Sequence, residues 1–251
     1  MKTAAALCLV AAAYGIDGPL SDYGRVVLDS NTRKAGVAPA VFDHWRHRAR
    51  FTCRLCHVDV GFAMSRGESH ISASTNRRGF HCGACHDGSR RYEGRPIFAS
   101  CSEGKDASSN PTCIRCHSDG RAQSAAEYAA LKLPRGALGD VDWQKAEERG
   151  KIHPLDALEG VSVARPPMAM DRDVQIRSQA SWMTDVKFSH RRHAVWNGCE
   201  VCHPEIFPRT RAGAAPFTML DISGGQACGA CHGKVAFPLA YCDRCHVKPV
   251  R

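Results

Sequence analysis

The chain has 251 residues, of which 43% are hydrophobic but only 7% aromatic, and it contains 22 glycines and 13 prolines. This composition favours loops and argues against a large, self-sufficient core of packed side chains. The formal net charge is +9, yet no sustained basic run with interleaved aromatic residues accompanies it, so we expect no nucleic-acid partner.

Residues 1–15 are expected to form an export leader. A single Lys precedes the short apolar run Ala4–Ala13, and Ala11 and Ala13 form an Ala-x-Ala cleavage pattern. The run is too short to cross a membrane as a helix, and no other segment approaches the 18 apolar residues of a membrane span. We therefore expect an exported protein with no transmembrane span in its mature chain. The alternative is an alanine-rich cytoplasmic amino terminus.

Residues 16–40 are polar and predict an extended lead-in with a short strand at Arg25–Leu28. A first module is expected over residues 41–118, with an insertion at 87–110. Within the insertion, SCSEGKDASSNP predicts a flexible surface loop. Cys101 lies in this loop, and it is either a free thiol or part of an intermolecular disulfide.

Residues 119–185 are expected to be a helical linker between two modules. Ala122–Leu133 has the composition of a helix and is stopped by Pro134. A second helix is expected at Val141–Arg149, capped by Asp140 and followed by a glycine. The second module is expected over residues 186–247.

The two modules are a duplication, because eight Cys and His positions of the first recur 146 residues later. The positions are His44, His47, Cys53, Cys56, His57, Cys82, Cys85 and His86, matched by His190, His193, Cys199, Cys202, His203, Cys228, Cys231 and His232. A third Cys-x-x-Cys-His motif closes each module, at Cys113–His117 and Cys242–His246. The gap before it is 17 residues longer in the first module, which is the insertion.

The six Cys-x-x-Cys-His motifs predict six covalently bound haem c groups. Two thiols within one helical turn can reach the two vinyl groups on one porphyrin edge, and the next residue turns its imidazole to the iron. Zinc sites need no His at the fifth position, so zinc, iron–sulfur and redox-dithiol interpretations are weaker. The expected thioether residues are Cys53, Cys56, Cys82, Cys85, Cys113, Cys116, Cys199, Cys202, Cys228, Cys231, Cys242 and Cys245. The expected proximal ligands are His57, His86, His117, His203, His232 and His246.

Four of the remaining histidines are expected to be distal ligands, because they recur in both modules before the first motif. His44 and His47, like His190 and His193, stand three residues apart, so each pair shares one helix face. Two imidazoles on one face can point to two different irons, which brings the two macrocycles close together.

The motifs FDHWRH, CRLCH, CGACHDG and CIRCH, followed by FSHRRH, CEVCH, CGACHGKVAF and CDRCH, resemble the triheme cytochrome c7 family, relatives of class III multihaem cytochromes. The resemblance implies tandem duplicated triheme modules wrapped around six covalent haems. It also implies a mostly irregular fold with short α-helices and little β structure.

The resemblance further implies that the first His of each pair caps the first haem of its module and the second His caps the second. It also implies that Met219 caps the third haem of the second module. The first module has Ala73 at that position. His70 is our first choice for the His117 haem, with His153 and His81 as alternatives. If none of them reaches the iron, this haem is five-coordinate and open to small ligands.

We expect an electron-transfer protein with no substrate chemistry of its own, working in the periplasm or outside the cell. Its partners would be cytochromes or a membrane-bound oxidoreductase. His/His ligation implies low potentials, and His/Met ligation at Met219 implies a higher one. The alternatives are a multihaem reductase with one open haem, and a self-assembling conducting subunit of a filament or membrane-associated complex.

Overall fold

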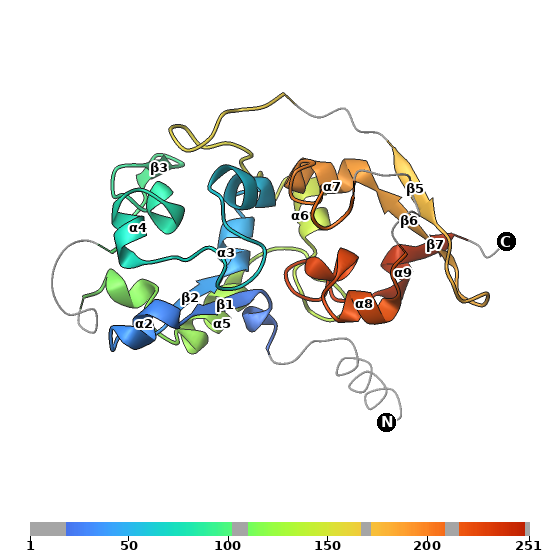
Figure 1. The fold of residues 1–251 in the computed structure, drawn as a ribbon, viewed down its shortest axis with the longest axis horizontal. Helices are drawn as coiled ribbons and strands as arrows, with labels where there is room; N and C mark the ends of the chain where they lie inside the picture. The colour runs from blue at the N-terminus through green and yellow to red at the C-terminus, as the bar shows by residue number, and fades with distance from the viewer. Residues whose placement is uncertain (1–18, 102–109, 167–171, 209–215, 249–251) are drawn as a thin grey trace.

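The computed structural model describes residues 19–101, 110–166, 172–208 and 216–248 (Figure 1). The expected leader and most of the SCSEGKDASSNP loop lie outside these residues. Short helices and small sheets are joined by long irregular segments, which confirms the predicted fold class. Within the part of the chain that the structure describes, no helix is both long enough and apolar enough to cross a membrane.

The first module and its lead-in occupy one side of the molecule in Figure 1. Their elements are η1 (Leu20–Asp22), β1 (Arg25–Leu28), α2 (Ser30–Lys34), β2 (Ala40–Asp43), α3 (His44–Arg48), η2 (Leu55–Asp59), α4 (Ala73–Arg77), η3 (His81–Ala84), β3 (Arg91–Tyr92), β4 (Arg95–Pro96) and η4 (Cys113–Arg115). The strand predicted at Arg25–Leu28 is confirmed as β1.

The second module lies on the other side, and the linker contributes one helix to each side (Figure 1). The linker helices are α5 (Arg121–Ala130) and α6 (Trp143–Glu148). The later elements are β5 (Asp173–Ile176), β6 (Asp185–Ser189), α7 (His190–Asn197), α8 (Met219–Ser223), η5 (Ala227–Ala230), α9 (Cys242–Cys245) and β7 (His246–Lys248).

Both modules begin with the same antiparallel strand pair that leads directly into a helix. β1 pairs with β2 so that Arg25 faces Asp43, and β5 pairs with β6 so that Asp173 faces Ser189. Asp43 and Ser189 are equivalent positions, since 146 residues separate them. The strand β5 was not predicted. β7 adds to the other side of β6 in the second module.

The linker helices confirm one prediction and correct another. α5 lies where a helix ending before Pro134 was expected. α6 begins later than predicted because Asp142, not Asp140, is its N-cap, and its carboxylate accepts the Lys145 backbone N–H at 3.1 Å. Asp140 is buried and instead accepts the hydroxyl of Tyr241.

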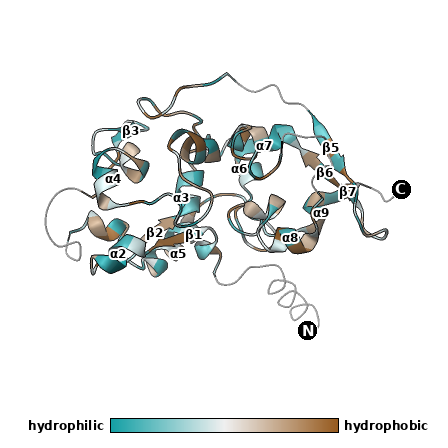
Figure 2. Ribbon diagram, viewed as in Figure 1, coloured by the Kyte–Doolittle hydropathy of each residue, from teal (hydrophilic) through white to brown (hydrophobic). Residues whose placement is uncertain are grey.

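Two small apolar clusters along the linker take the place of a single core. One consists of Trp45, Tyr128 and Val141, and the other of Ala146, Ile152 and Trp196. Leu133 and Trp143 of the linker pack against both clusters and so join them. Figure 2 shows the apolar residues as short, scattered stretches. The linker is therefore the structural seam between the modules.

An ion pair between a buried arginine and a partly exposed carboxylate also ties the linker to the first motif. The Arg54 guanidinium is only 4% exposed and donates to both carboxylate oxygens of Asp156, at 3.1 and 2.6 Å. The Thr52 hydroxyl donates to the same carboxylate at 3.1 Å. Since Cys53 stands between these two residues, the linker carboxylate holds the backbone at the start of the motif.

The second motif of each module packs against backbone through its glycine. A Cβ on Gly83 would lie 1.8 Å from the carbonyl oxygen of Asn76, and a Cβ on Gly229 would lie 1.8 Å from that of Ile222. The two contacts are equivalent in the duplication. Only glycine fits at this position of the motif.

We predict that Gly229→Ala lowers the free energy of unfolding by about 2 kcal/mol or more, because the added methyl group meets rigid backbone. Thermal unfolding of the purified protein measures this effect. Gly224→Ala is the matched control, because Gly224 has an ordinary φ of −73° and its Cβ would lie 3.3 Å from the nearest atom. Equal stability losses in the two variants would contradict the prediction.

Candidate haem-binding sites

Each Cys-x-x-Cys-His motif closes one tight turn that places its two thiols and its imidazole together. In the second and third motifs of the first module, the His86 and His117 backbone N–H groups donate to the carbonyls of Cys82 and Cys113, both at 2.8 Å. In the second module, His203 donates in the same way to Cys199 at 3.0 Å. The first motif of the chain adopts a π-helical turn, η2, and such turns are frequent at functional sites.

The imidazoles of the motifs share one feature, which is a hydrogen bond from Nδ1 to a backbone carbonyl. A carbonyl oxygen can only accept, so Nδ1 carries the proton and Nε2 keeps its lone pair. Metal-binding histidines are commonly oriented in this way. The donor–acceptor pairs are His57–Phe62, His86–Phe98, His117–Ala38, His203–Phe207, His232–Phe237 and His246–Thr184.

The histidines of the strand–helix units are oriented by carbonyls too. His44 donates through Nδ1 to Gly24 at 2.5 Å, and its counterpart His190 donates to Arg172 at 3.0 Å. Both carbonyls belong to the residue directly before the first strand of their module. The strand pair therefore positions the carbonyl that orients this histidine in each module. His193 donates to Ser189 at 2.9 Å. The Asp43 carbonyl lies in the equivalent place beneath His47, although the buried Nδ1 atom does not complete a hydrogen bond there.

Three of these histidines face a motif imidazole across a gap. The ring centroids of His44 and His57 lie 6.4 Å apart, with planes parallel to within 4°. Subtracting roughly 1 Å from each centroid to its nitrogen leaves about 4 Å, which is two metal–nitrogen bonds of about 2.0 Å. The donor set and its spacing therefore fit a haem iron held between two imidazoles.

The second site of each module repeats this arrangement closely. His47 and His86 have ring centroids 6.2 Å apart with planes at 65°, and His193 and His232 have centroids 6.2 Å apart with planes at 62°. The predicted His44–His57, His47–His86 and His193–His232 pairs are thus brought together in space. His190 adopts the orientation of His44, as its carbonyl contact indicates.

These paired imidazoles are electrically neutral at pH 7. Burial, together with His86, lowers the pKa of His47 to about 3, and burial, together with His193, lowers the pKa of His232 to about 4. Burial also lowers the pKa of His57. The neutral imidazole is the form that donates an electron pair to a metal.

Successive motifs bring their thiols close together within the first module. Burial is the main reason that the pKa of Cys56 is raised to about 12, and the neighbouring thiol of Cys85 is the second. Burial is also the main reason that the pKa of Cys82 is raised to about 12, and the neighbouring thiol of Cys116 is the second. Thiols interact in this way only at short range. The three attachment sites of the module are therefore neighbours in motif order.

The thiols also approach one another across the seam. Burial is the main reason that the pKa of Cys202 in the second module is raised, and the thiol of Cys53 in the first module is the second. Burial is the main reason that the pKa of Cys231 is raised to about 12, and the nearby thiols of Cys53 and Cys202 raise it further. Within the second module, burial is the main reason that the pKa of Cys228 is raised to about 11, and the neighbouring thiol of Cys245 is the second. The attachment sites thus form one series that runs through both modules.

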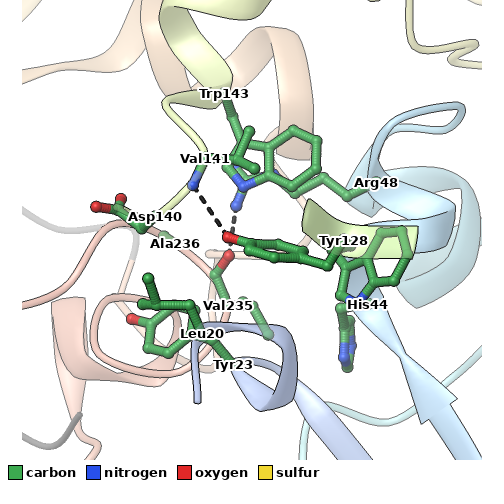
Figure 3. Close-up of a pocket in the computed structure, with 11 residues that line it drawn as sticks. Leu20, Tyr23, His44, Arg48, Tyr128, Asp140, Val141, Trp143, Val235 and Ala236 are labelled. Carbon is green, nitrogen blue, oxygen red and sulfur yellow. Dashed lines mark hydrogen bonds between the residues drawn. The ribbon is translucent and has the colours of Figure 1, made fainter. Parts of the chain in front are cut away.

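A cationic side chain with an unused donor lies at this seam. Arg48 donates through Nη1 to the carbonyl of Val235, and the Trp143 ring lies 5.0 Å from its guanidinium (Figure 3). The Trp196 ring lies 5.1 Å from the same guanidinium. The Arg48 Nε atom is buried and has no hydrogen-bond partner in the described structure. Burial lowers the pKa of Arg48, and the neighbouring thiol of Cys53 partly offsets this shift.

The two third sites differ from each other. In the second module, Met219 opens α8 and is 45% exposed, and His246 is held by the Thr184 carbonyl. In the first module, the side chain placed on the His117 imidazole is that of Cys101, and their hydrogen bond lowers the pKa of the Cys101 thiol. The same hydrogen bond raises the pKa of His117.

The three histidines considered for the His117 haem lie in different surroundings. His70 is exposed and has a φ of 48°, and His153 is exposed in the linker. His81 has a buried Nδ1 atom with no hydrogen-bond partner among the described residues, and its ring lies 5.4 Å from that of Phe62. The placement of these three as ligands stays a prediction.

Some residues of the sites were not predicted from the sequence. Phe98 and Phe237 contact the second motif histidines, with ring centroids 4.4 Å from His86 and 4.1 Å from His232. Their spacing from these histidines differs between modules because the insertion intervenes. Seven of its 17 extra residues precede Phe98, where β3 and β4 form a hairpin, and ten follow it. Comparing the two copies for a displaced Phe could have found this pair.

Comparisons with known proteins identify a family and several similar chains. The family model described as cytochrome c7 and related cytochrome c matches residues 40–118 and 186–247. A solved c7-type three-heme cytochrome domain is 38% identical, over 33% of this chain and 95% of that domain, with a TM-score of 0.27.

Two solved structures match over most of the chain. The C-terminal hexaheme fragment of GSU1996 is 24% identical, over 92% of this chain and 99% of that fragment, with a TM-score of 0.28. The dodecaheme cytochrome c GSU1996 is 23% identical, over 89% of this chain and 74% of that chain, with a TM-score of 0.27. No curated protein matches the chain. Because the family model covers more than half of the chain, in both modules, this protein belongs to the family of cytochrome c7 and related cytochrome c, which transfer electrons through covalently bound haem.

Proposed function

We propose that this chain is a hexahaem cytochrome that carries electrons through both modules along closely spaced haems. The proposal is carried by the facing imidazole pairs His44–His57, His47–His86 and His193–His232. It is supported by the pKa shifts that the attachment thiols impose on one another, from Cys116 to Cys82 and Cys56, from Cys53 to Cys202 across the seam, and on to Cys245. Haems attached at neighbouring thiols are themselves neighbours. A series of this kind suits electron relay over the length of the molecule.

In this proposal each haem is held by one motif and by a distal side chain from another element. His44, His47, His190 and His193 would be the distal ligands of the first and second haems of the two modules. Met219 would serve the His246 haem. Bound haem supplies a one-electron carrier at each site. The chain's contribution is to hold neutral imidazoles on both sides of each iron, so that reduction requires little rearrangement.

The backbone carbonyls are central to that contribution. Each fixes the tautomer and the orientation of an imidazole before haem binds, and each raises the basicity of the ligand. Two imidazoles give a low reduction potential, whereas a methionine ligand raises it. With Met219 as ligand, the His246 haem would have the highest potential of the second module and would be the natural electron acceptor at that end.

The seam supports transfer between the modules. Cys53 lies near both Cys202 and Cys231, so the first haem of one module would face the first two of the other. Arg48 lies among these thiols and would stabilise electrons there. We further propose that the protein works in the periplasm or outside the cell with other redox proteins as partners. The apolar run Ala4–Ala13 supports export.

We predict that the protein made in a host that matures c-type cytochromes carries six covalent haems per chain. Intact mass and iron content measure this number. Replacing Cys82 and Cys85 together with Ala should leave five haems, since thioether attachment at that motif is lost. A count below six in the unaltered chain, or zinc in place of iron, would contradict the proposal.

We predict that His193→Ala adds one CO-binding haem per reduced chain relative to the unaltered protein. The substitution removes the ligand that faces His232 and opens that iron to a small molecule. CO difference spectra measure the number of open haems. Arg33→Ala is the control, because the Arg33 side chain is 79% exposed and is not a candidate ligand, and it should leave the spectra unchanged. No gain in CO binding by His193→Ala would rule out its assigned role.

We predict that Arg48→Met lowers the reduction potential of a haem at the seam. Loss of a partly buried positive charge roughly 10 Å from an iron is worth about 1 to 2 kcal/mol at an effective dielectric constant of 20, or about 40 to 80 mV. A spectroscopic redox titration measures the shift. Arg33→Met removes the same charge from a side chain that is 79% exposed, and it should leave all potentials nearly unchanged. An upward shift in Arg48→Met would be evidence against the electrostatic role.

A further inference from the structure

A phenylalanine contacts the motif imidazole of the second haem site in each module. The ring centroids of Phe98 and His86 lie 4.4 Å apart, and those of Phe237 and His232 lie 4.1 Å apart. The backbone carbonyl of the same phenylalanine accepts the imidazole Nδ1 hydrogen bond, at 3.2 Å in the first module and 3.4 Å in the second. One residue therefore contacts each imidazole both through its ring and through its carbonyl.

An arginine of the third motif lies over each of these phenylalanine rings. Its Cζ atom is 4.7 Å from the ring centroid in the first module and 4.5 Å from it in the second. At such distances a guanidinium is attracted to the face of an aromatic ring. We call the resulting set of three side chains a clamp. The two clamps consist of Arg115, Phe98 and His86 in the first module and Arg244, Phe237 and His232 in the second.

The arginine is specific to the third motifs. Both of them, CIRCH and CDRCH, have it directly before the second cysteine. The other four motifs have an aliphatic residue at that position, namely Leu55, Ala84, Val201 and Ala230. Attachment of haem at a motif therefore does not require the arginine. Its contact with the phenylalanine ring is the feature that the two third motifs share.

The insertion in the first module makes this recurrence informative. The phenylalanine follows the second-motif histidine by 12 residues in the first module and by 5 in the second. The arginine follows the phenylalanine by 17 residues in the first module and by 7 in the second. Both connections differ in length, yet the equivalent ring distances agree within 0.3 Å. The clamp is therefore not a by-product of chain spacing.

The charge of the arginine does not account for the recurrence. Arg244 forms an ion pair with Asp142 of the linker at 3.5 Å, which partly neutralises it. Arg115 is exposed, so solvent and salt screen its charge. The planar guanidinium lying over the ring is common to both modules. A lysine cannot reproduce it, because its ammonium group is a compact and strongly hydrated point charge.

The clamped imidazoles also have a distinct orientation relative to the imidazoles that face them. The planes of the facing rings cross at 65° in the first module and at 62° in the second. At the first site of the first module, the planes of His44 and His57 are only 4° apart. The angle between two axial imidazoles decides how their orbitals overlap with those of an iron between them. The second sites therefore form an electronic class of their own.

We propose that Arg115 and Arg244 are positioning residues for the second haem of each module. Each guanidinium holds the phenylalanine beneath it, and the phenylalanine holds the plane of His86 or His232. This inference rests on the proposed function, because it assumes that haem binds at the second motifs. The matched clamps keep the two second haems alike, although the modules differ in length.

Low-temperature EPR of the oxidised holoprotein tests this inference, with the haem count of each sample measured first. Crossed imidazole planes give a low-spin ferric signal with an unusually large g value, whereas parallel planes give an ordinary rhombic signal. We expect at least two haems of the unaltered protein to give the large-g signal. Arg244→Leu should move the signal of one haem, with all six haems still attached. Arg244→Lys should do the same, because it keeps the charge but not the planar group.

Phe237→Leu removes the ring but keeps the backbone carbonyl, and it should move the same signal. The double variant Phe237→Leu/Arg244→Leu should show no further change, because the arginine acts only through the ring. Arg135→Leu is the matched control. The Arg135 guanidinium lies 4.5 Å over the ring of Tyr128, which packs against Trp45. Its loss should leave the large-g signal unchanged.

An unchanged signal in Arg244→Leu, full rescue by Arg244→Lys or a further change in the double variant would overturn the inference. Arg115→Leu repeats the test in the first module, so loss of a haem from a second-module variant does not prevent a decision. Failure of the proposed function gives a different result, since the haem count of the unaltered protein would then fall below six.

Discussion

The hydrogen bond from imidazole Nδ1 to a backbone carbonyl is the interaction on which the rest of this structure depends. It leaves Nε2 free on nine histidines, from His44 to His246. The short strands and turns of the fold exist largely to deliver these carbonyls. Gly24 and Arg172, for example, directly precede β1 and β5, and each meets the first His of the following helix.

This constraint also explains why the protein manages with so little apolar core. Two small clusters along the linker join the modules, and residues around them, such as Arg48, keep buried donors that no group among the described residues satisfies. In our account the macrocycles fill the remaining space. The same packing brings Cys53 near Cys202 and Cys231, so assembly of the seam and electron transfer across it depend on the same contacts.

Local features of the chain were predictable because spacing alone determines them. The motifs, the His44/His47 and His190/His193 pairs and the strand at Arg25–Leu28 follow from short-range pattern and the 146-residue repeat. Features that depend on distant contacts were not predicted. Asp140 was expected to cap α6, yet Tyr241 binds it from 101 residues away. Cys101 could be placed beside His117 and Asn76 only by folding, since loop sequence does not reveal where a loop lies.

A crystal structure of the haem-loaded protein tests the central claim most directly, through the order and spacing of its irons. The account predicts one continuous series, running from the His117 haem through those of His86 and His57 to the second module and ending at the His246 haem. The haem of His57 should lie against those of His203 and His232. Two separate haem clusters, one in each module and too far apart for direct contact, would contradict the account.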